Sequence, residues 1–291
     1  MKRQLLKGIT PKGFKKRFNK DEDCYKYLSE LKWADESFVC KRCGHTHYCK
    51  GHLPYARRCT RCKHDESPLA GTVFEKIKFS LLTAFQLIFD FCTIERKAST
   101  ITLSSKYDIR QKTIWEFKHK VQQSIGCMNV EMLDNNVYLG KFIIEDNRKR
   151  QATNNIVVAL EISGNGGVGR AYAEIIDCTS DKATKEFLER HCHPSTTIFI
   201  SKEKENDILI NGWSDVQFFA NNEAVEMLNE HIAELKNWLC GNHRNCSHEH
   251  IQGYLNEYYF RFNLRKQKSI MFSTLLSHMA NTPPKRTKSK S

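Results

Sequence analysis

Two cysteine pairs constrain this chain more than any other feature of its sequence. The first is Cys40 and Cys43, the second is Cys59 and Cys62, and each pair encloses two residues. That spacing lets a tight turn aim both sulfurs at one ion, and two such turns supply the four ligands of tetrahedral zinc. The segment between the pairs has room for a β-hairpin, with strands in THYCKG and YARRCT. We therefore expect a zinc ribbon over residues 36–70, held by a structural zinc ion because so small a core does not fold without metal.

The charge of the chain favours a partner covered in phosphate. The net charge is +13 and the pI is about 9.2, a balance that suits nucleic acid and also suits a merely basic surface. Arg57, Arg58 and Arg61 surround the cysteines and are expected to contact DNA. No stretch is long and apolar enough to span a bilayer, and the start lacks the apolar region of a signal peptide. We expect a cytoplasmic protein, associated with the nucleoid in a prokaryote, with no membrane partner and with thiols rather than disulfides.

Helical patterns flank the predicted ribbon. Residues 1–35 read as a basic segment and a helix, with Tyr25, Leu28 and Leu31 facing inward. Residues 71–128 read as a helical region whose first helix has an N-cap candidate in Ser80. Two further helices are expected at about 99–106 and 111–124, with a turn at 107–109 between them.

The last two of these helices fit a helix–turn–helix, although any three-helix bundle would give a similar pattern. In the second helix, Ile114, Phe117 and Val121 share one face. The residues expected near bases or phosphates are Gln111, Lys112, Thr113 and Lys118.

From about Val137 the pattern changes to strands, in KFIIE, NIVVALEIS and GRAYAEIID. GNGG reads as a hairpin turn between the last two. A helix, a strand in TTIFIS and an amphipathic helix in EAVEMLNEHIAELKNWLC follow. This order is the one expected of a ribonuclease-H-like domain, assigned to residues 137–275, with a disordered basic tail over 276–291. The fold class is thus α+β and multidomain: a zinc ribbon and helix–turn–helix followed by a ribonuclease-H-like α/β domain.

Several segments together resemble one family. They are the ribbon, RRCTRCKHDESPLAGTVFEKIKFSLLTAFQLIF, QKTIWEFKHKVQ and the closing LKNWLCGNHRNCSHEHIQGYLNEYYFRFNLR. The chain is similar over about Asp21 to Arg265 to insertion-sequence transposases with an amino-terminal zinc ribbon and a DDE-type catalytic domain, the ISXO-like group. The resemblance implies double-stranded DNA as partner, either terminal inverted repeats or a derived site. It also implies two Mg²⁺ ions held by carboxylates if the protein is active. Transposases of this fold commonly act as dimers or larger assemblies, so a homo-oligomer stays open.

The same resemblance assigns positions to a catalytic site. In FIIED, Glu145 falls on the position of the first Asp, with Asp146 as its neighbour. Ser201, at the end of TTIFIS, falls on the second Asp. Asn229 falls on the third, variable position, and Lys236 on a lysine seven residues later. Two helical turns separate these last two, so they share a side of the helix; two surface polar residues would look the same.

Two functions follow from these departures from the family pattern. A serine cannot supply the charge of a carboxylate, and the nearest acids, Glu203 and Glu205, could substitute only if their loop folded back. We expect a DNA-binding protein of the transposase family with a degenerate catalytic triad. The alternative is an active DDE-type transposase that cuts and joins element ends with two divalent metals, using Glu145 or Asp146 with a partner such as Glu203.

Overall fold

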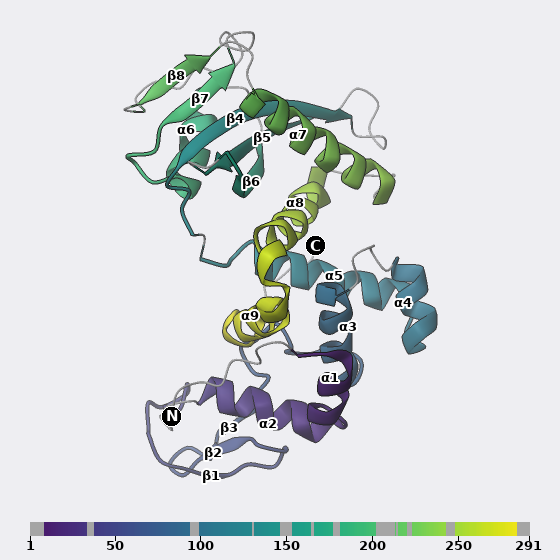
Figure 1. Ribbon diagram of the computed structural model, residues 1–291. Coiled ribbons are helices and arrows are strands. Elements are labelled where there is room, and N and C mark those ends of the chain that lie inside the picture. Colours follow the sequence, from purple (N-terminus) through teal and green to yellow (C-terminus); the bar gives the residue numbers. More distant parts are fainter. Residues whose placement is uncertain are drawn as a thin grey trace. The chain divides into compact units, whose positions relative to one another are not determined.

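The structure is a computed structural model that describes residues 9–33, 38–93, 99–129, 131–145, 153–163, 166–176, 181–201, 213, 215–219, 223–242 and 248–283 (Figure 1). The chain divides into two compact units. The first comprises Met1–Cys127 together with Lys266–Ser291, and the second is Met128–Arg265. Each unit has its own sheet, so the chain is a mixed helix-and-sheet protein, as predicted. Within the described residues, no helix combines the length and apolarity needed to cross a membrane.

The first unit combines helices with a three-stranded sheet of order β1-β2-β3. Its helices are α1 (Pro11–Arg17), α2 (Asp21–Lys32), α3 (Leu81–Thr93), α4 (Thr100–Tyr107), α5 (Gln111–Ile125) and α9 (Lys268–Asn281). Its strands are β1 (Tyr48–Lys50), β2 (Arg57–Cys59) and β3 (Asp65–Glu66). The antiparallel pairing of β1 with β2 confirms the predicted hairpin between the cysteine pairs, whereas β3 was not predicted.

Side-chain caps set where these helices begin. At the start of α1, the Thr10 hydroxyl accepts a hydrogen bond from the Gly13 N–H at 3.1 Å. The predicted cap Ser80 accepts one from the Thr83 N–H at 3.0 Å. In addition, the Asp21 carboxylate of α2 accepts the Leu82 N–H at 2.7 Å. These groups satisfy N–H donors that the first turn of a helix leaves unpaired, and the last bond also ties α2 to α3.

Aromatic rings fill the core between α1, α3 and α9. The Phe14 ring lies 4.7 Å from Phe89 and 5.7 Å from Phe272, and Phe18 lies 5.1 Å from Phe85. All five side chains are buried. Tilted and edge-on pairs of this kind stabilise beyond the area they bury. The N-terminal basic segment is therefore anchored to the unit by its phenylalanines.

Helices α4 and α5 follow the sequence closely. The structure has α4 at Thr100–Tyr107 and α5 at Gln111–Ile125, against predictions of 99–106 and 111–124. Ile114, Phe117 and Val121 are buried, which confirms the predicted inner face of α5.

The last helix differs from the prediction. Residues 276–281, assigned from sequence to a disordered tail, form the end of α9. Leu275, Leu276 and Met279 are fully buried, because α9 packs against α2, α3 and α5 in the first unit. Residues up to 275 were expected in the central domain, but the second unit ends at Arg265. Residues 284–291 lie outside the described part of the chain.

The second unit is built around a five-stranded sheet of order β6-β5-β4-β7-β8. Its strands are β4 (Asn136–Glu145), β5 (Thr153–Ile162), β6 (Val168–Ile176), β7 (Ile198–Ser201) and β8 (Val216–Phe219). Its helices are α6 (Asp181–His191), α7 (Glu223–Asn242) and α8 (His248–Asn263). β4, β5 and β6 are antiparallel neighbours, whereas β7 runs parallel to β4 and β8 parallel to β7. Strand β8 was not predicted.

The two faces of this sheet bury separate cores. Even-numbered residues of β4, such as Tyr138 and Phe142, pack with residues of α7 and α8. Odd-numbered ones, such as Val137 and Leu139, pack with residues of α6. Side chains alternate between faces along a strand, so this parity fixes which helix each β4 side chain meets. Figure 1 shows the sheet with the helices α6, α7 and α8 labelled beside it.

Candidate functional site

The four thiols of the cysteine pairs meet at one point of the ribbon. All four sulfur atoms lie within 4.8 Å of one another. The Sγ of Cys40 lies 3.5 Å from that of Cys62, and the Sγ of Cys43 lies 3.6 Å from that of Cys59. A tetrahedron with Zn–S bonds of about 2.3 Å has sulfurs about 3.8 Å apart. The cluster therefore has the donor set and the size of a structural zinc site.

Each cysteine pair lies on a turn of the same backbone design. The N–H of the first cysteine of each pair donates to the carbonyl five residues later, at 2.9 Å in both turns. The residue after each pair has a positive φ, +71° at Gly44 and 60° at Lys63. Glycine adopts this region freely. The two halves of the site thus repeat one another, as a ribbon requires.

The chemistry of the thiols also fits zinc. Burial opposes the charged form of Cys59, but the N–H groups of Cys62 and Arg61 and the neighbouring thiols outweigh it and lower the pKa of Cys59 to about 6. At neutral pH this group is mostly the thiolate, the form that binds metal. Besides the cysteines, the buried core of the ribbon contains only Trp33 and Phe38 among the described residues, too little to hold the turns without an ion.

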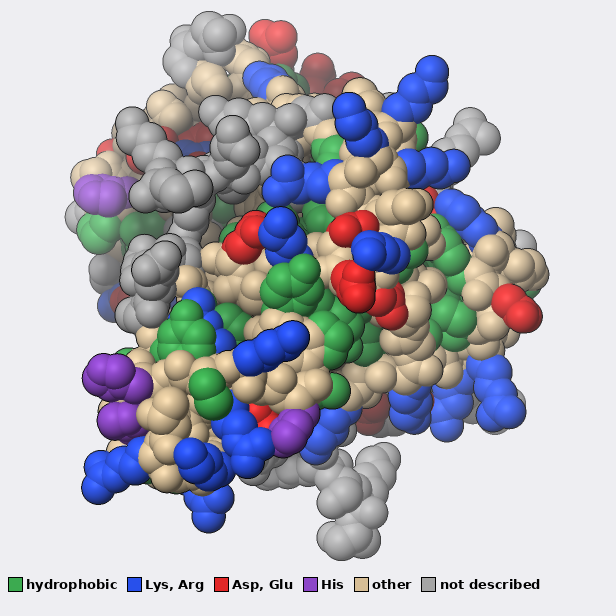
Figure 2. Space-filling model, turned by 90° about the horizontal axis from the view of Figure 1, so that it is seen from below, with side chains coloured by type: hydrophobic (Ala, Val, Ile, Leu, Met, Phe, Trp, Pro, Cys, Tyr) green, Lys and Arg blue, Asp and Glu red, His purple; other side chains and the backbone are tan. Residues whose placement is uncertain are grey.

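The three predicted ribbon arginines have different surroundings. The guanidinium of Arg57 lies over the Tyr48 ring, 4.1 Å from its centre. Arg58 lies 3.9 Å from the Asp65 carboxylate. Arg61 is exposed. In Figure 2, seen from the side of the ribbon, Lys and Arg side chains are frequent on the surface over and beside it. Arg61 is therefore the most open of the three to a phosphate, whereas Arg57 and Arg58 also pack or pair within the protein.

The residues predicted to contact DNA from α5 lie at its start and along its outer side. Gln111 and Lys112 are exposed, and Thr113 and Lys118 are half-buried. The Gln111 amide donates to the Thr100 hydroxyl at 3.2 Å, which ties the first turn of α5 to the first turn of α4. These side chains lie outside the row of Ile114, Phe117 and Val121 that α5 buries.

Ser201 lies at the end of β7, beside the middle of β4. The last residues paired between these parallel strands are Leu139 and Ile200. The register therefore puts Ser201 across from Gly140, one step further on. Ile200 packs on the α6 side and Phe199 on the α7 side, so alternation directs Ser201 to the α7 side with Gly140.

Helix α7 closes directly over this point. A Cβ on Gly140 would lie 2.8 Å from Cδ1 of Ile232 and 3.3 Å from Cδ2 of Leu228. Contacts that short do not occur without movement of the neighbours. The space beside Ser201 that a longer side chain at position 140 would need is thus occupied by two aliphatic side chains.

Glu145 does not lie beside Ser201. It ends β4, five residues past Gly140, which at about 3.3 Å per residue is about 16 Å along the strand. The preceding residue, Ile144, packs on the α7 side. Because neighbouring side chains of a strand point to opposite faces, the exposed side chain of Glu145 belongs to the other face. The predicted pair of positions on adjacent strands is therefore not brought together. The other acids named from sequence, which fall outside the described residues, are Asp146, Glu203 and Glu205.

Asn229 and Lys236 are both exposed on α7. The Lys236 ammonium lies 5.1 Å from the centre of the Phe142 ring on β4. Asn229 follows Leu228, which packs over Gly140. Both residues therefore lie on α7 near the face of the sheet that Ser201 shares, and neither brings a negative charge there.

Two family models match this chain. One, described as an ISXO2-like transposase domain, matches residues 130–263, and the other, described as a transposase zinc-ribbon domain, matches residues 19–65. The chain belongs to the ISXO2-like transposases. The zinc-ribbon match of this ISXO2-like transposase contains all four clustered cysteines, and the other match contains the five-stranded sheet. No curated protein matches the chain.

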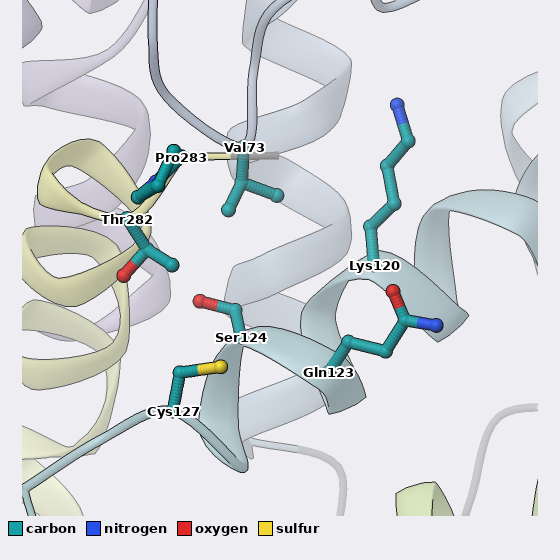
Figure 3. A pocket seen from close by; sticks show the side chains of 7 residues that line it. All are labelled: Val73, Lys120, Gln123, Ser124, Cys127, Thr282 and Pro283. Atoms are coloured by element: carbon teal, nitrogen blue, oxygen red, sulfur yellow. The ribbon is translucent and has the colours of Figure 1, made fainter. Parts of the chain in front are cut away.

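Two pockets of this ISXO2-like transposase lie away from Ser201, Asn229 and Lys236. One, of about 250 Å³, is lined by residues at the start of β4 and β7, such as Asn136 and Thr197, at the opposite strand ends from Ser201. The other, of about 20 Å³, is in the first unit (Figure 3). Ser124 and Thr282 border it, and the buried Ser124 hydroxyl has no hydrogen-bond partner among the described residues. A pocket this small holds about one water molecule. Neither pocket is lined by Ser201, Asn229 or Lys236.

Sequence reasoning missed Gly140 and Trp115. A glycine inside an otherwise apolar strand often marks a close approach of another element, and that signal was available for Gly140. An exposed tryptophan on α5 cannot be told from a buried one by helical spacing alone, because the ring lies between the inner and outer faces.

Proposed function

We propose that this ISXO2-like transposase binds double-stranded DNA and has lost the carboxylate set needed for two-metal strand cleavage. The target would be the terminal inverted repeats of an element or a site derived from them. The proposal includes a ribonuclease-H-like fold for the second unit, a helix–turn–helix at α4 and α5, and self-association on paired DNA ends. In a prokaryotic cell, such binding would hold the protein at the nucleoid.

The strand arrangement supports the proposed fold. Three antiparallel strands, β6, β5 and β4, continue into two strands parallel to β4, with α6 joining the two sets. Helix α7 then returns over the sheet near the end of β7. In open sheets with parallel strands, functional groups collect at the carboxyl ends of the strands. Ser201 is at the carboxyl end of β7, beside Gly140 in the middle of β4.

The register of β4 and β7 carries the proposed loss of catalysis, because one step past its last pair it puts Ser201 across from Gly140, under α7. Two divalent ions need several oxygen ligands with negative charge. On the α7 side of β4 and β7, the described residues contribute apolar groups, an amide, a glycine and a hydroxyl, and no carboxylate. Lys236 adds positive charge nearby. Among the described residues, the four cysteines form the one group of three or more His, Cys, Asp and Glu side chains that could hold a metal.

Charge and architecture support DNA as the partner. The chain carries a net charge of +13, and α1 alone exposes several lysines without an acidic residue. A zinc-held ribbon and a pair of short helices joined by a tight turn offer rigid elements to a duplex. Lysine and arginine contacts with phosphate displace counterions, so the affinity should fall steeply with salt.

Fluorescence anisotropy with labelled end-sequence DNA tests the binding, and a crystal soaked with Mn²⁺ tests the missing site. We expect salt-dependent binding that does not require Mg²⁺, and no ion beside Ser201 or Asp146. An ion clamped between Asp146 or Glu145 and a second acid such as Glu203 would contradict the loss of catalysis. Absence of any DNA affinity at low salt would contradict the proposal as a whole.

A further inference from the structure

Trp115 is exposed at the border between the inner and outer faces of α5. The residue is 38% exposed, and its ring meets the His119 imidazole edge-on, with centroids 4.0 Å apart. Helical spacing puts Lys112, Trp115 and His119 in one row, three and four residues apart. Lys118 lies three residues after Trp115 and directly precedes His119. The contact with His119 holds a large apolar surface in place on a polar and basic helix.

A second exposed apolar side chain lies at the start of α4. Ile101 is 63% exposed and follows Thr100, whose hydroxyl accepts the hydrogen bond of Gln111. Trp115 is one helical turn after Gln111, so both apolar groups adjoin the link between the two helices. A tryptophan is costly to leave in water, because it carries a large apolar area. Two such groups on the outer side of one helix pair indicate a surface that is covered in the working state of the protein.

The charge around this surface decides what covers it. On α5, Lys112 and Lys118 are each three residues from Trp115, one before it and one after it. The helix has one acid, Glu116, and Arg110 precedes it. A protein partner that buried this patch would have to match so many cations, whereas DNA supplies phosphates on both sides of its major groove. The groove admits an α-helix, and the thymine methyl group offers an apolar contact inside it. An apolar ring in the middle of a row with lysines beside it has the layout of a base contact flanked by phosphate contacts.

We infer that Trp115 is a specificity-determining residue that contacts base edges in the major groove, including thymine methyl groups, while Lys112 and Lys118 bind the flanking phosphates. This inference rests on the proposed DNA binding. It assigns the reading of sequence to an apolar side chain, whereas the polar residues at the start of α5 position the helix. Loss of the ring should therefore reduce discrimination between sequences more than it reduces affinity for DNA in general.

The experiment starts with selection of the preferred sequence of the wild-type protein from a random duplex library. The Kd is then measured for the selected duplex and for a scrambled duplex of the same composition. For Trp115→Ala we expect affinity for the selected duplex to fall about tenfold or more, as for the loss of one good base contact. Affinity for the scrambled duplex should change less than about twofold, since phosphate contacts supply nonspecific binding. Trp115→Phe, which keeps an apolar ring, should retain most of the discrimination.

Lys112→Gln is the matched comparison on the same helix. It should weaken both duplexes by a similar factor and reduce the salt dependence by about one ion. Tryptophan fluorescence gives an independent readout, because Trp115 is exposed whereas Trp33 is buried and Trp213 and Trp238 are half-buried. Selected DNA should quench the wild-type signal, and Trp115→Phe should lose most of that quenching.

The outcomes separate the two proposals. If the wild type binds no DNA, the proposed function fails. If it binds with preference and folded Trp115→Ala keeps the full ratio of selected to scrambled affinity, the role of Trp115 is overturned while DNA binding stands. If Trp115→Ala instead lowers the mass of the free protein from dimer to monomer and leaves the ratio unchanged, the ring contacts a second copy and the inference is equally overturned.

Discussion

Addition of one methyl group at Gly140 tests the close approach of α7 to β4. In Gly140→Ala, the new Cβ would meet Cδ1 of Ile232 at 2.8 Å and Cδ2 of Leu228 at 3.3 Å. Neither neighbour can withdraw freely, because Leu228 and Ile232 are buried in the same core. Overpacking of a well-filled core costs about 1–3 kcal/mol. We expect the second unit to lose stability by about that amount, although alanine is the smallest possible side chain.

Ile232→Val provides the compensating change, because valine lacks Cδ1, the atom in the shortest contact. Alone, Ile232→Val should destabilise by about 0.5–1.5 kcal/mol. Combined with Gly140→Ala, it should add little further loss, so the double-mutant cycle should show a favourable coupling of about 1 kcal/mol or more. Gly241→Ala is the matched control on α7, since nothing lies within 4 Å of a Cβ there. It should be neutral, or stabilising by up to about 1 kcal/mol.

Amide hydrogen exchange of β4 peptides measures these effects within the second unit alone. A loss of 1–3 kcal/mol corresponds to exchange about 5 to 150 times faster from the open state. If the β4 amides of Gly140→Ala exchanged no faster than those of Gly241→Ala, the close packing of α7 on β4 would be refuted. Independent effects of Gly140→Ala and Ile232→Val would refute the contact between these two positions.

Three further predictions concern the ribbon, His231 in the second unit, and α1. Cys43→Ser should remove bound zinc and unfold the ribbon by circular dichroism, whereas Cys49→Ser, at an exposed cysteine outside the cluster, should keep one zinc per chain. Burial, aided by Arg265, lowers the pKa of His231 from 6.5 to about 4. The neutral form is favoured in the folded state, so stability present above pH 6.5 should decline as the pH falls toward 4, by about 3 kcal/mol at about 1.4 kcal/mol per pKa unit; a flat urea-midpoint profile in wild type relative to His231→Gln would contradict this. The exposed lysines of α1 are Lys12, Lys15 and Lys16. Their replacement by glutamine should lower the slope of log affinity against log salt by up to about 3, and an unchanged slope would mean that α1 does not touch the duplex.

Local signals predicted the first unit well. The cysteine spacing determines the ribbon because four thiolates at one ion leave few alternative folds, and Ser80 begins a helix for a reason that acts within one turn. The inner face of α5 follows from the period of Ile114, Phe117 and Val121. Helix α2 shows the limit of this reasoning. The sequence predicted Tyr25 and Leu31 inward, but Cys24, Tyr27 and Leu28 are the buried residues, because the helix packs against neighbours that shift its buried stripe by part of a turn.

The catalytic region was harder because it depends on register between distant strands. Nothing in FIIED or TTIFIS says which residue of β4 lies opposite the end of β7. The structure pairs Leu139 with Ile200, and this puts Gly140, rather than Glu145, across from Ser201. Likewise β8 is a short strand defined by its pairing with β7. Helix α9 belongs to the first unit because it packs against α2, α3 and α5, which are distant from it in the sequence.

Single-turnover cleavage of end-sequence DNA tests the central claim most directly. The zinc-loaded protein is incubated in excess over labelled duplex, with Mg²⁺ or Mn²⁺, beside Asp146→Ala and a metal-free control. We predict that the bound DNA stays intact, with no more breakage for the wild type than for Asp146→Ala or the metal-free control. Metal-dependent nicks that appear with the wild type and vanish in Asp146→Ala would contradict the loss of the two-metal centre.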